Sequence, residues 1–206
     1  MKVEIIKNAA ELESLTPFHV DHLLWGTKSI PKTYGYFGFV PDDAFYLKMI
    51  CEERDPLCTY THDMDPVYRD SAMEAFFQFE SKVARLQAVY LNFETNSGGA
   101  LLAGCGKERI YRSYFTKDMC RALRSTARVE KDFWTWNMKL PVSILEEIYG
   151  PLHLGEGSTF TCNFYKISET KEIEHYASYS PILSDIPSFH LTEFFETAVI
   201  TKTHQE

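Results

Sequence analysis

The clearest strand signal in the sequence is the stretch Phe45-Tyr46-Leu47-Lys48-Met49-Ile50-Cys51-Glu52. Phe45, Leu47, Met49 and Cys51 alternate with the other four residues, and this period of two predicts a β-strand with one face on the core. Pro41-Asp42-Asp43 predicts a turn just before it, and the run containing Tyr34 and Tyr36 predicts an earlier strand. The first third of the chain is therefore predicted to form β-strands.

Further along the chain, Met73, Ala75, Phe77 and Phe79 alternate with Ala72, Glu74, Phe76 and Gln78. Only one of these sets can face the principal core, so Glu74 is expected on the side opposite Met73 and Phe77. Further strands are predicted at 85–93, 100–104, 133–140 and 198–202, with a turn at 96–99 and renewed alternation at Phe160, Cys162 and Phe164. In the run 133–140, Trp134 and Trp136 share a face and are expected to pack in the core.

Helical signals are few. The segment 141–151 predicts one helix, with capping-box spacing between Ser143 and Glu146 and a stop at Gly150-Pro151. The segment 117–129 predicts either a second helix or an irregular crossover. Many short strands with one or two short helices predict an all-β, antiparallel β-sandwich with jelly-roll-like connections, in one domain over residues 1–206. The rival is an α/β enzyme fold, which needs helices between parallel strands.

Composition limits the partners. The net charge of −8 argues against nucleic acid, because binding to phosphates normally needs a basic patch, and the basic residues from Arg109 to Lys131 are interrupted by acidic ones. The five cysteines form no C-x-x-C pair and indicate free thiols in a reducing compartment. No apolar stretch approaches the ~18 residues of a membrane span, and Met1–Asn8 lacks the apolar core of a signal peptide. We expect a cytoplasmic protein with no membrane partner; a leader missing from this sequence stays an alternative, and the oligomeric state is open.

Aromatic residues are abundant, with 12 tyrosines and 15 phenylalanines. Tyr68 lies beside Asp70-Ser71-Ala72-Met73-Glu74, and Tyr179 lies within Tyr176-Ala177-Ser178-Tyr179-Ser180-Pro181. An aromatic ring with polar neighbours suits the apolar face of a pyranose. This composition predicts a binding protein for a small carbohydrate before it predicts an enzyme.

These segments, in their order along the chain, resemble the family 9 carbohydrate-binding modules and their stand-alone relatives. The motifs are Tyr68-Arg69-Asp70-Ser71-Ala72-Met73-Glu74-Ala75-Phe76-Phe77, the strand with Tyr90-Leu91-Asn92-Phe93, then 133–141 and 176–181. The resemblance covers about residues 37–200 and implies a β-sandwich that binds a sugar without catalysis.

The resemblance also implies a site. Two aromatic residues clamp a terminal sugar in that family, and they match Tyr68 and Tyr179; a strand glutamate that binds sugar hydroxyls matches Glu74, and Tyr90 or Asn92 is the nearest candidate for a further polar residue. Both clamp positions carry tyrosine where the family usually has tryptophan. The run 187–196 resembles a signature of the stand-alone relatives but lacks its Arg-Pro pair and its glycine.

Two other functions stay open. Tyr68, Tyr179 and Glu74 could be ordinary loop and strand residues of a sandwich that has lost sugar binding and contacts a protein. A glycoside hydrolase would need two carboxyl groups roughly 5–9.5 Å apart, and Asp70 and Glu74 would lie ~13 Å apart along a strand. No catalytic residue is assigned.

No cofactor is expected, and metal ligands are weak candidates. Relatives of this fold often carry a structural calcium ion, for which Asp63 and Asp65 are the candidates, with capping of their own turn as the alternative. The His19-x-x-His22 pair lacks further zinc ligands in the sequence.

Overall fold

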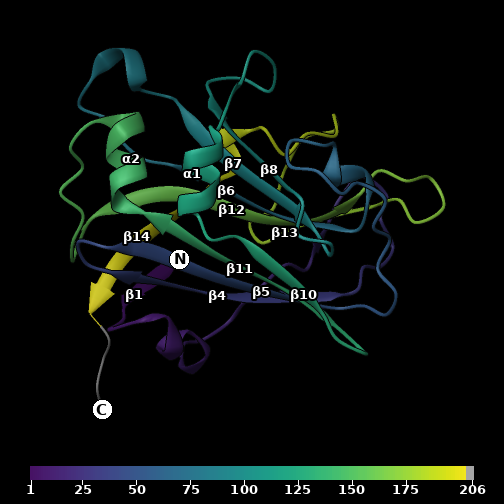
Figure 1. Ribbon diagram of the computed structural model, residues 1–206. Coiled ribbons are helices and arrows are strands. Elements are labelled where there is room, and N and C mark those ends of the chain that lie inside the picture. Colours follow the sequence, from purple (N-terminus) through teal and green to yellow (C-terminus); the bar gives the residue numbers. More distant parts are fainter. Residues whose placement is uncertain (203–206) are drawn as a thin grey trace.

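The structure is a computed structural model that describes residues 1–202, so the last four residues of the predicted domain lie outside it. Its strands form one continuous sheet that curls into two layers (Figure 1). The order across the sheet is β10 (Thr126–Val129), β11 (Trp134–Pro141), β5 (Ala44–Glu52), β4 (Lys32–Val40), β1 (Lys2–Ile5), β14 (Glu196–Lys202), β12 (Thr159–Ser168), β6 (Ala72–Gln78), β7 (Tyr90–Asn96), β8 (Leu101–Gly106) and β9 (Ser113–Tyr114). Short strands β2 (Phe18–His19), β3 (His22–Leu23) and β13 (His175–Ser178) extend it at β4, β13 and β12.

The predicted sandwich is confirmed, with one refinement. Most neighbouring strands are antiparallel, but β1 pairs in parallel with both β4 and β14. Strand β1 therefore joins the layer of β4, β5, β10 and β11 to the layer of β6, β7, β8 and β12. The α/β alternative is wrong, because the two α-helices described, α1 (Lys117–Ala122) and α2 (Val142–Tyr149), are short and do not alternate with the strands.

The principal core lies between the layers and is rich in phenylalanine. The Phe37 ring on β4 stacks on Phe45 of β5 at 5.4 Å and on Phe77 of β6 at 5.3 Å, which links the two layers. Trp134 and Trp136 are fully buried in this core, as the sequence predicts. Full burial of such side chains contributes roughly 1.5–3 kcal/mol each.

Several boundaries differ from the sequence prediction. The predicted strand 85–93 begins only at Tyr90, after the 3-10 helix η3 (Ala84–Leu86). The segment 117–129 is neither one helix nor a plain crossover, but α1 followed by β10. Helix α2 begins after Pro141 with no side-chain cap, so the predicted capping box is wrong, whereas Gly150 ends the helix with φ of +78°.

The second face of β12, β6 and β7 is also covered. Glu74 and Phe76 lie on this face, opposite Met73 and Phe77, as the alternation predicts. A smaller apolar cluster packs over it, with Leu24 from the N-terminal segment and Phe189 and Phe195 from the segment before β14. The remaining 3-10 helices are η1 (Ala9–Ser14), η2 (Val67–Arg69) and η4 (Thr192–Phe194). The cover is incomplete above Glu74, and a pocket opens there.

Candidate ligand-binding site

The opening, here called the outer-face pocket, has a volume of about 280 Å³. That volume is near the lower end of ligand pockets, ~300–1,000 Å³, and suits a small ligand. The strands supply its floor, and the covering loops supply its walls. Its aromatic lining consists of Trp25, Tyr68, Tyr114, Tyr176 and Phe189, and its polar lining includes Glu74, Asn92, Glu94, Arg109, Arg112, Glu169 and His190.

Three half-buried aromatic residues form walls of the outer-face pocket: Tyr68 on η2, Tyr176 on β13 and Trp25 in the turn after β3. The Trp25 ring meets the Tyr176 ring edge-on at 5.4 Å, and its Nε1 donates a hydrogen bond to the Ser184 carbonyl at 2.7 Å. Trp25 has a φ of +49°, which is uncommon for a bulky residue. Such backbone strain persists only where surrounding contacts hold it, and it gathers at functional sites.

Backbone hydrogen bonds fix the positions of Tyr68 and Tyr176. The carbonyl of Tyr68 accepts from the Glu169 N–H at 3.0 Å, which ties η2 to the end of β12. The Tyr176 N–H donates to Thr27 Oγ1 at 2.9 Å, and its carbonyl accepts from the Leu24 N–H at 3.0 Å. Both tyrosines are therefore anchored to neighbouring segments through their main chains, and the Tyr176 hydroxyl also donates a hydrogen bond to Glu174 Oε1 at 2.8 Å.

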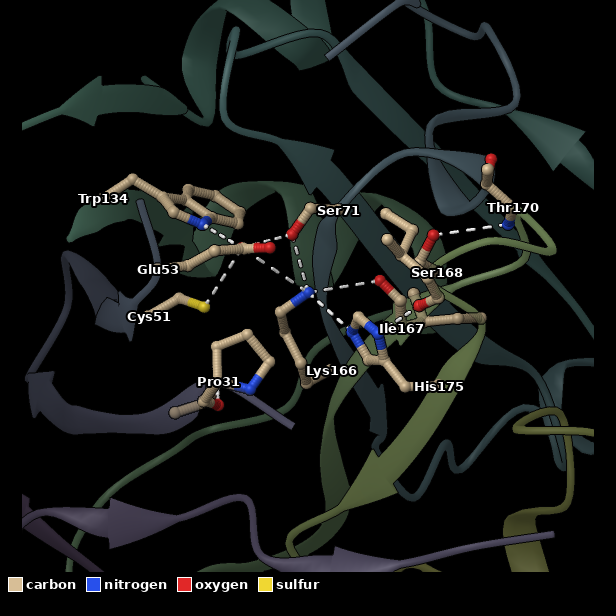
Figure 2. Close-up of polar contacts among 12 residues, drawn as sticks. Pro31, Cys51, Glu53, Ser71, Trp134, Lys166, Ile167, Ser168, Thr170 and His175 are labelled. Carbon is tan, nitrogen blue, oxygen red and sulfur yellow. Dashed lines mark hydrogen bonds and ion pairs between the residues drawn. The ribbon is translucent and has the colours of Figure 1, made fainter. Parts of the chain in front are cut away.

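A buried polar network lies beneath these two segments, centred on Lys166 (Figure 2). Its Nζ donates to Ser71 Oγ at 2.7 Å and contacts His175 Nε2 at 2.9 Å. Ser71 in turn donates to Glu53 Oε2, which lies 4.0 Å from Lys166 Nζ and also accepts from Trp134 Nε1 at 3.1 Å. The network links the strand after Tyr68 to His175, the neighbour of Tyr176.

The protonation states of this network follow from its geometry. Burial and the nearby Lys166 ammonium lower the pKa of His175 to about 4, so the ring is neutral at pH 7. Its Nε2 then accepts from Lys166, while Nδ1–H donates to the Ile173 carbonyl at 2.6 Å. Burial works against ionisation of Glu53, but Lys166 and the hydrogen bonds from Ser71 and Trp134 outweigh it and lower the pKa of that carboxyl. Lys166 and Glu53 thus form a buried ion pair.

The floor of the outer-face pocket carries two carboxyl groups. Glu74 on β6 is the direct register partner of Glu94 on β7, and each side chain is 3% exposed. Asn92 Nδ2 donates to Glu94 Oε1 at 2.9 Å, and Asn92 Oδ1 accepts from Arg112 Nε at 2.8 Å. Burial, followed by the repulsion of Glu94, raises the pKa of Glu74 well above its usual value; burial also raises the pKa of Glu94, to about 7.

Arg112 lines the outer-face pocket beside Asn92. Its guanidinium lies 4.2 Å from the centre of the Tyr90 ring and donates to the carbonyls of Glu108, Tyr90 and Gly104. A side chain at Gly104 would approach Asn92 Oδ1 within 3.2 Å, so glycine leaves room for the contact between Asn92 and Arg112. Burial lowers the pKa of Arg112. The cation is thus engaged by carbonyls and by Asn92, and it makes no hydrogen bond to either glutamate among the described residues.

Three of the residues implied by the resemblance meet in the outer-face pocket: Tyr68, Glu74 and Asn92. Tyr90 does not line it. The Tyr90 side chain is fully buried beneath Arg112, and its hydroxyl lies 2.8 Å from His190 Nδ1. Between the two alternatives on that strand, the geometry places Asn92 at the pocket and Tyr90 below it.

Tyr179 also lies elsewhere, and the expected clamp of Tyr68 with Tyr179 is not formed. Because β13 pairs with β12, its side chains alternate, and Tyr176 faces the outer-face pocket while Ala177 faces the principal core. Tyr179, three residues after Tyr176, falls on the core side and meets the Phe18 ring edge-on at 5.7 Å. It lines a separate hollow with Phe18, His19 and His22. The aromatic residue that shares the pocket with Tyr68 is Tyr176.

Asp70 and the metal candidates have local partners. The Asp70 carboxylate is fully buried and accepts from the Thr59 and Tyr60 N–H groups and from Asn96 Nδ2, so it does not pair with Glu74. Asp63 accepts from the Leu101 N–H and Asp65 from the His62 N–H. Within residues 1–202, no three His, Cys, Asp or Glu side chains are grouped to hold a metal, and His19 and His22 are exposed. Asp63 and Asp65 thus each accept a hydrogen bond from a backbone N–H group, and a structural calcium ion at these residues stays a prediction.

The sequence interpretation missed Glu94, Tyr176 and Trp25 as pocket residues. A signal existed for Glu94, since it continues the alternation of Tyr90 and Asn92 onto the face that Glu74 shares. Tyr176 belongs to the quoted aromatic segment, and only the register of β13 separates its role from that of Tyr179. No local sequence pattern marks Trp25 as a pocket residue. It reaches the pocket because the N-terminal segment lies along β13, where β3 pairs with that strand.

Comparison with known proteins identifies a matching family. The family model described as "Carbohydrate-binding family 9" matches residues 5–200, nearly the whole chain. A search of curated proteins finds no match. No helix among residues 1–202 is long and apolar enough to cross a membrane.

Solved structures share the fold. A candidate carbohydrate-binding protein from Bacteroides uniformis has a TM-score of 0.81 at 21% identity, covering 97% of this chain and 98% of that one. A family 9 carbohydrate-binding module from Caldicellulosiruptor kristjanssonii in complex with glucose has a TM-score of 0.65 at 8% identity, covering 100% and 97%. A structure described as the same kind of module from that organism, with cellotriose, has a TM-score of 0.63 at 8% identity, covering 98% and 94%. At these identities the structures support the fold.

Proposed function

The chain belongs to carbohydrate-binding family 9, and from this premise we propose that the outer-face pocket is its sugar site. As a member of this family, the protein binds carbohydrate and is not an enzyme. In our proposal Tyr68 and Tyr176 hold the two faces of a sugar ring, and Glu74 and Glu94 bind its hydroxyls. The proposal keeps the aromatic clamp of the family but replaces Tyr179 with Tyr176.

One observation carries the proposal: two half-buried tyrosines and an unengaged buried carboxyl group line the same small pocket. A pyranose has C–H faces that stack on aromatic rings and a belt of hydroxyl groups that needs acceptors and donors. Hydrogen bonds from those hydroxyls to a carboxylate are about twice as strong as neutral ones. Tyr68 and Tyr176 would supply stacking area, and the pair of Glu74 and Glu94 would select a ligand with hydroxyl groups.

The ligand class follows from the size and the lining of the pocket. A volume of about 280 Å³ suits one sugar ring, with further units of an oligosaccharide extending past the mouth. The glucose and cellotriose in the two Caldicellulosiruptor structures make glucose and cello-oligosaccharides the first ligands to test. Xylo-oligosaccharides form the comparison series, because they lack the hydroxymethyl group.

The other two functions have less support. Glycoside hydrolysis would need Asp70 as the second catalytic carboxyl group beside Glu74. The Asp70 carboxylate is instead engaged by the backbone N–H groups of Thr59 and Tyr60. A protein-binding sandwich would present its aromatic residues on a flat apolar patch of several hundred Å². Here Tyr68, Tyr176 and Trp25 gather around a concave pocket with a charged floor, which favours a small polar ligand.

Calorimetric titration with glucose, cellobiose, cellotriose and xylotriose tests the proposal. The variants Tyr68→Ala and Tyr176→Ala are expected to lose measurable binding, since each opens one face of the sugar to water. The matched control is Tyr179→Ala, which removes a tyrosine of similar burial outside the pocket and is expected to bind like the native protein. Loss of binding in Tyr179→Ala with full binding in Tyr176→Ala would move the site away from the outer-face pocket.

A further inference from the structure

Two carboxyl groups lie side by side on the floor of the outer-face pocket. Glu74 and Glu94 are directly opposite on antiparallel neighbours, so their side chains leave the same face of the sheet. Directly opposite residues have Cβ atoms about 5 Å apart. Both side chains are almost completely buried, yet both line the pocket, so their carboxyl groups meet whatever ligand enters it.

The hydrogen bonds around this pair are unequal. Glu94 accepts from Asn92, and Asn92 is oriented by Arg112, which gives Glu94 a polar support. Glu74 has no hydrogen-bond partner among residues 1–202, and its neighbour across β12 is the fully buried Tyr165. The carboxyl oxygens of Glu74 reach the space of the pocket, so Glu74 is the member that a ligand or a proton can satisfy.

The surrounding charges do not neutralise the pair. Arg109, Arg112 and Lys166 favour ionisation, but Arg109 is exposed, Arg112 is engaged by Asn92 and backbone carbonyls, and Lys166 lies on the other face of β12. Glu169, which is exposed at the end of β12, opposes ionisation of both glutamates.

The neutral titratable groups around the pair are His190 and the tyrosines Tyr68, Tyr90, Tyr114, Tyr165 and Tyr176. Burial lowers the pKa of His190 to about 3 and raises the pKa of Tyr68, Tyr90, Tyr165 and Tyr176, so these groups supply no charge near pH 7. Arg109 and Arg112 line the same pocket, but among residues 1–202 neither makes a hydrogen bond or an ion pair with Glu74 or Glu94.

We propose, on the premise that the outer-face pocket is the sugar site, that Glu74 and Glu94 act as one acid and carboxylate pair that binds a neutral sugar together with a proton. The ionised member accepts hydrogen bonds from sugar hydroxyls, and the protonated member donates one to a sugar oxygen. A sugar that fills the pocket displaces water from both groups, and this makes a second negative charge still less favourable. Above neutral pH, where the free pair begins to lose its second proton, binding then takes up a proton, and no covalent bond to the sugar forms or breaks.

The pair also sets the class of ligand. A uronic acid would bring a second carboxylate beside the ionised member of the pair, so we expect it to bind more weakly than the neutral sugar. A neutral hexose brings hydroxyl groups only. An amino sugar would bring an ammonium group that replaces the proton, and its affinity would rise with pH where that of a neutral sugar falls.

Calorimetry of glucose or cellotriose binding at pH 8 in phosphate and in Tris measures the proton directly, because the two buffers have different ionisation enthalpies. We expect uptake of a fraction of a proton, up to one. We also expect a Kd that increases between pH 7 and pH 8.5 with a limiting slope of about tenfold per pH unit. Binding with no proton uptake, or with release, would overturn the proposal; an absence of binding at every pH would instead reject the sugar site itself.

Two variants sharpen the test. In Glu94→Gln the repulsion on Glu74 is gone while its burial remains, so the proton uptake and the pH dependence of binding are expected to move to lower pH than in the native protein. The control Glu147→Gln changes an exposed glutamate on α2 and is expected to keep both at the pH of the native protein. If Glu94→Gln keeps the proton uptake of the native protein at the same pH, the pair is not its source. Should this variant fail to fold, the two-buffer measurement on the native protein decides alone.

Discussion

The ring of Trp25 meets the ring of Tyr176 edge-on, with 5.4 Å between their centres, and so joins the N-terminal segment to β13 at the wall of the outer-face pocket. Trp25 is held there by its hydrogen bond to the Ser184 carbonyl, which crosses to the loop before Phe189. Trp25, in the N-terminal segment, thus contacts both β13 and the loop before Phe189. The pocket wall therefore depends on these three segments keeping their positions.

Trp25→Ala should weaken sugar binding on the order of tenfold, because the Tyr176 ring loses its edge-on neighbour and the wall becomes mobile. Aromatic pairs of this kind contribute about 0.5–1.5 kcal/mol beyond their buried area. Trp25→Phe is the control, since it keeps an aromatic ring but removes the indole hydrogen bond. Its affinity for the sugar should lie between that of the native protein and that of Trp25→Ala. Titration with cellotriose measures the effect; equal affinities in all three proteins would exclude Trp25 from the site.

Enlarging Tyr179 should leave sugar affinity unchanged. If Tyr179 formed one wall of the sugar clamp, Tyr179→Trp would tighten binding by adding stacking area, but Tyr179 packs edge-on against Phe18 on the core side of β13. Tyr176→Trp is the substitution that adds area inside the outer-face pocket, and about 25 cal/mol per Å² over some tens of Å² gives roughly 1 kcal/mol, or several-fold in affinity. A titration in which Tyr179→Trp binds more tightly and Tyr176→Trp does not would contradict the assignment of the walls.

Stability should depend on pH through Glu94. Its folded pKa of about 7 lies above the ordinary glutamate value, so the neutral carboxyl is favoured in the folded protein, and the free energy of unfolding decreases as pH rises from about 5 through 7. Glu94→Gln cannot ionise and should be more stable than the native protein at pH 8 by up to about 3 kcal/mol relative to their difference at pH 5. Urea denaturation at both pH values provides the measurement. An equal difference at pH 5 and pH 8 would show that Glu94 titrates normally.

The free energy of unfolding should decrease when either member of the buried pair of Lys166 and Glu53 is replaced. Lys166→Met leaves the Glu53 carboxylate beneath the site without its cation, and breaking a buried pair in this way costs about 3–5 kcal/mol. The double variant Lys166→Met with Glu53→Gln removes both charges and should recover a large part of that loss. Denaturation curves of the native, single and double variants measure the coupling. A single variant within about 0.5 kcal/mol of the native protein would mean that the pair is unimportant for stability.

The sequence predicted the sandwich well, because alternation in β5, β6 and β11 records which side chains face the core. Through the family resemblance and the face that Glu74 occupies, it predicted a site with Tyr68, Glu74 and either Tyr90 or Asn92, and the first two of these and Asn92 line one pocket. It failed where a tertiary contact sets the geometry: the register of β13 against β12 selects Tyr176 over Tyr179, and the fold of the N-terminal segment over β13 brings Trp25 to the pocket.

The parallel pairing of β1 with β4 and β14 is also invisible to local patterns, since strand direction depends on how distant segments meet. The pairing of Glu74 with Glu94 needs the register between β6 and β7, which neither strand encodes alone. Local sequence gives the faces of the strands, and long-range pairing decides which faces meet.

A crystal structure of the protein with bound glucose or cellotriose tests the central claim most directly. The account predicts a sugar ring in the outer-face pocket, with its two faces against Tyr68 and Tyr176 and with hydroxyl groups within hydrogen-bond distance of Glu74 and Glu94. A sugar bound instead in the hollow beside Phe18 and Tyr179, with the outer-face pocket empty, would contradict it.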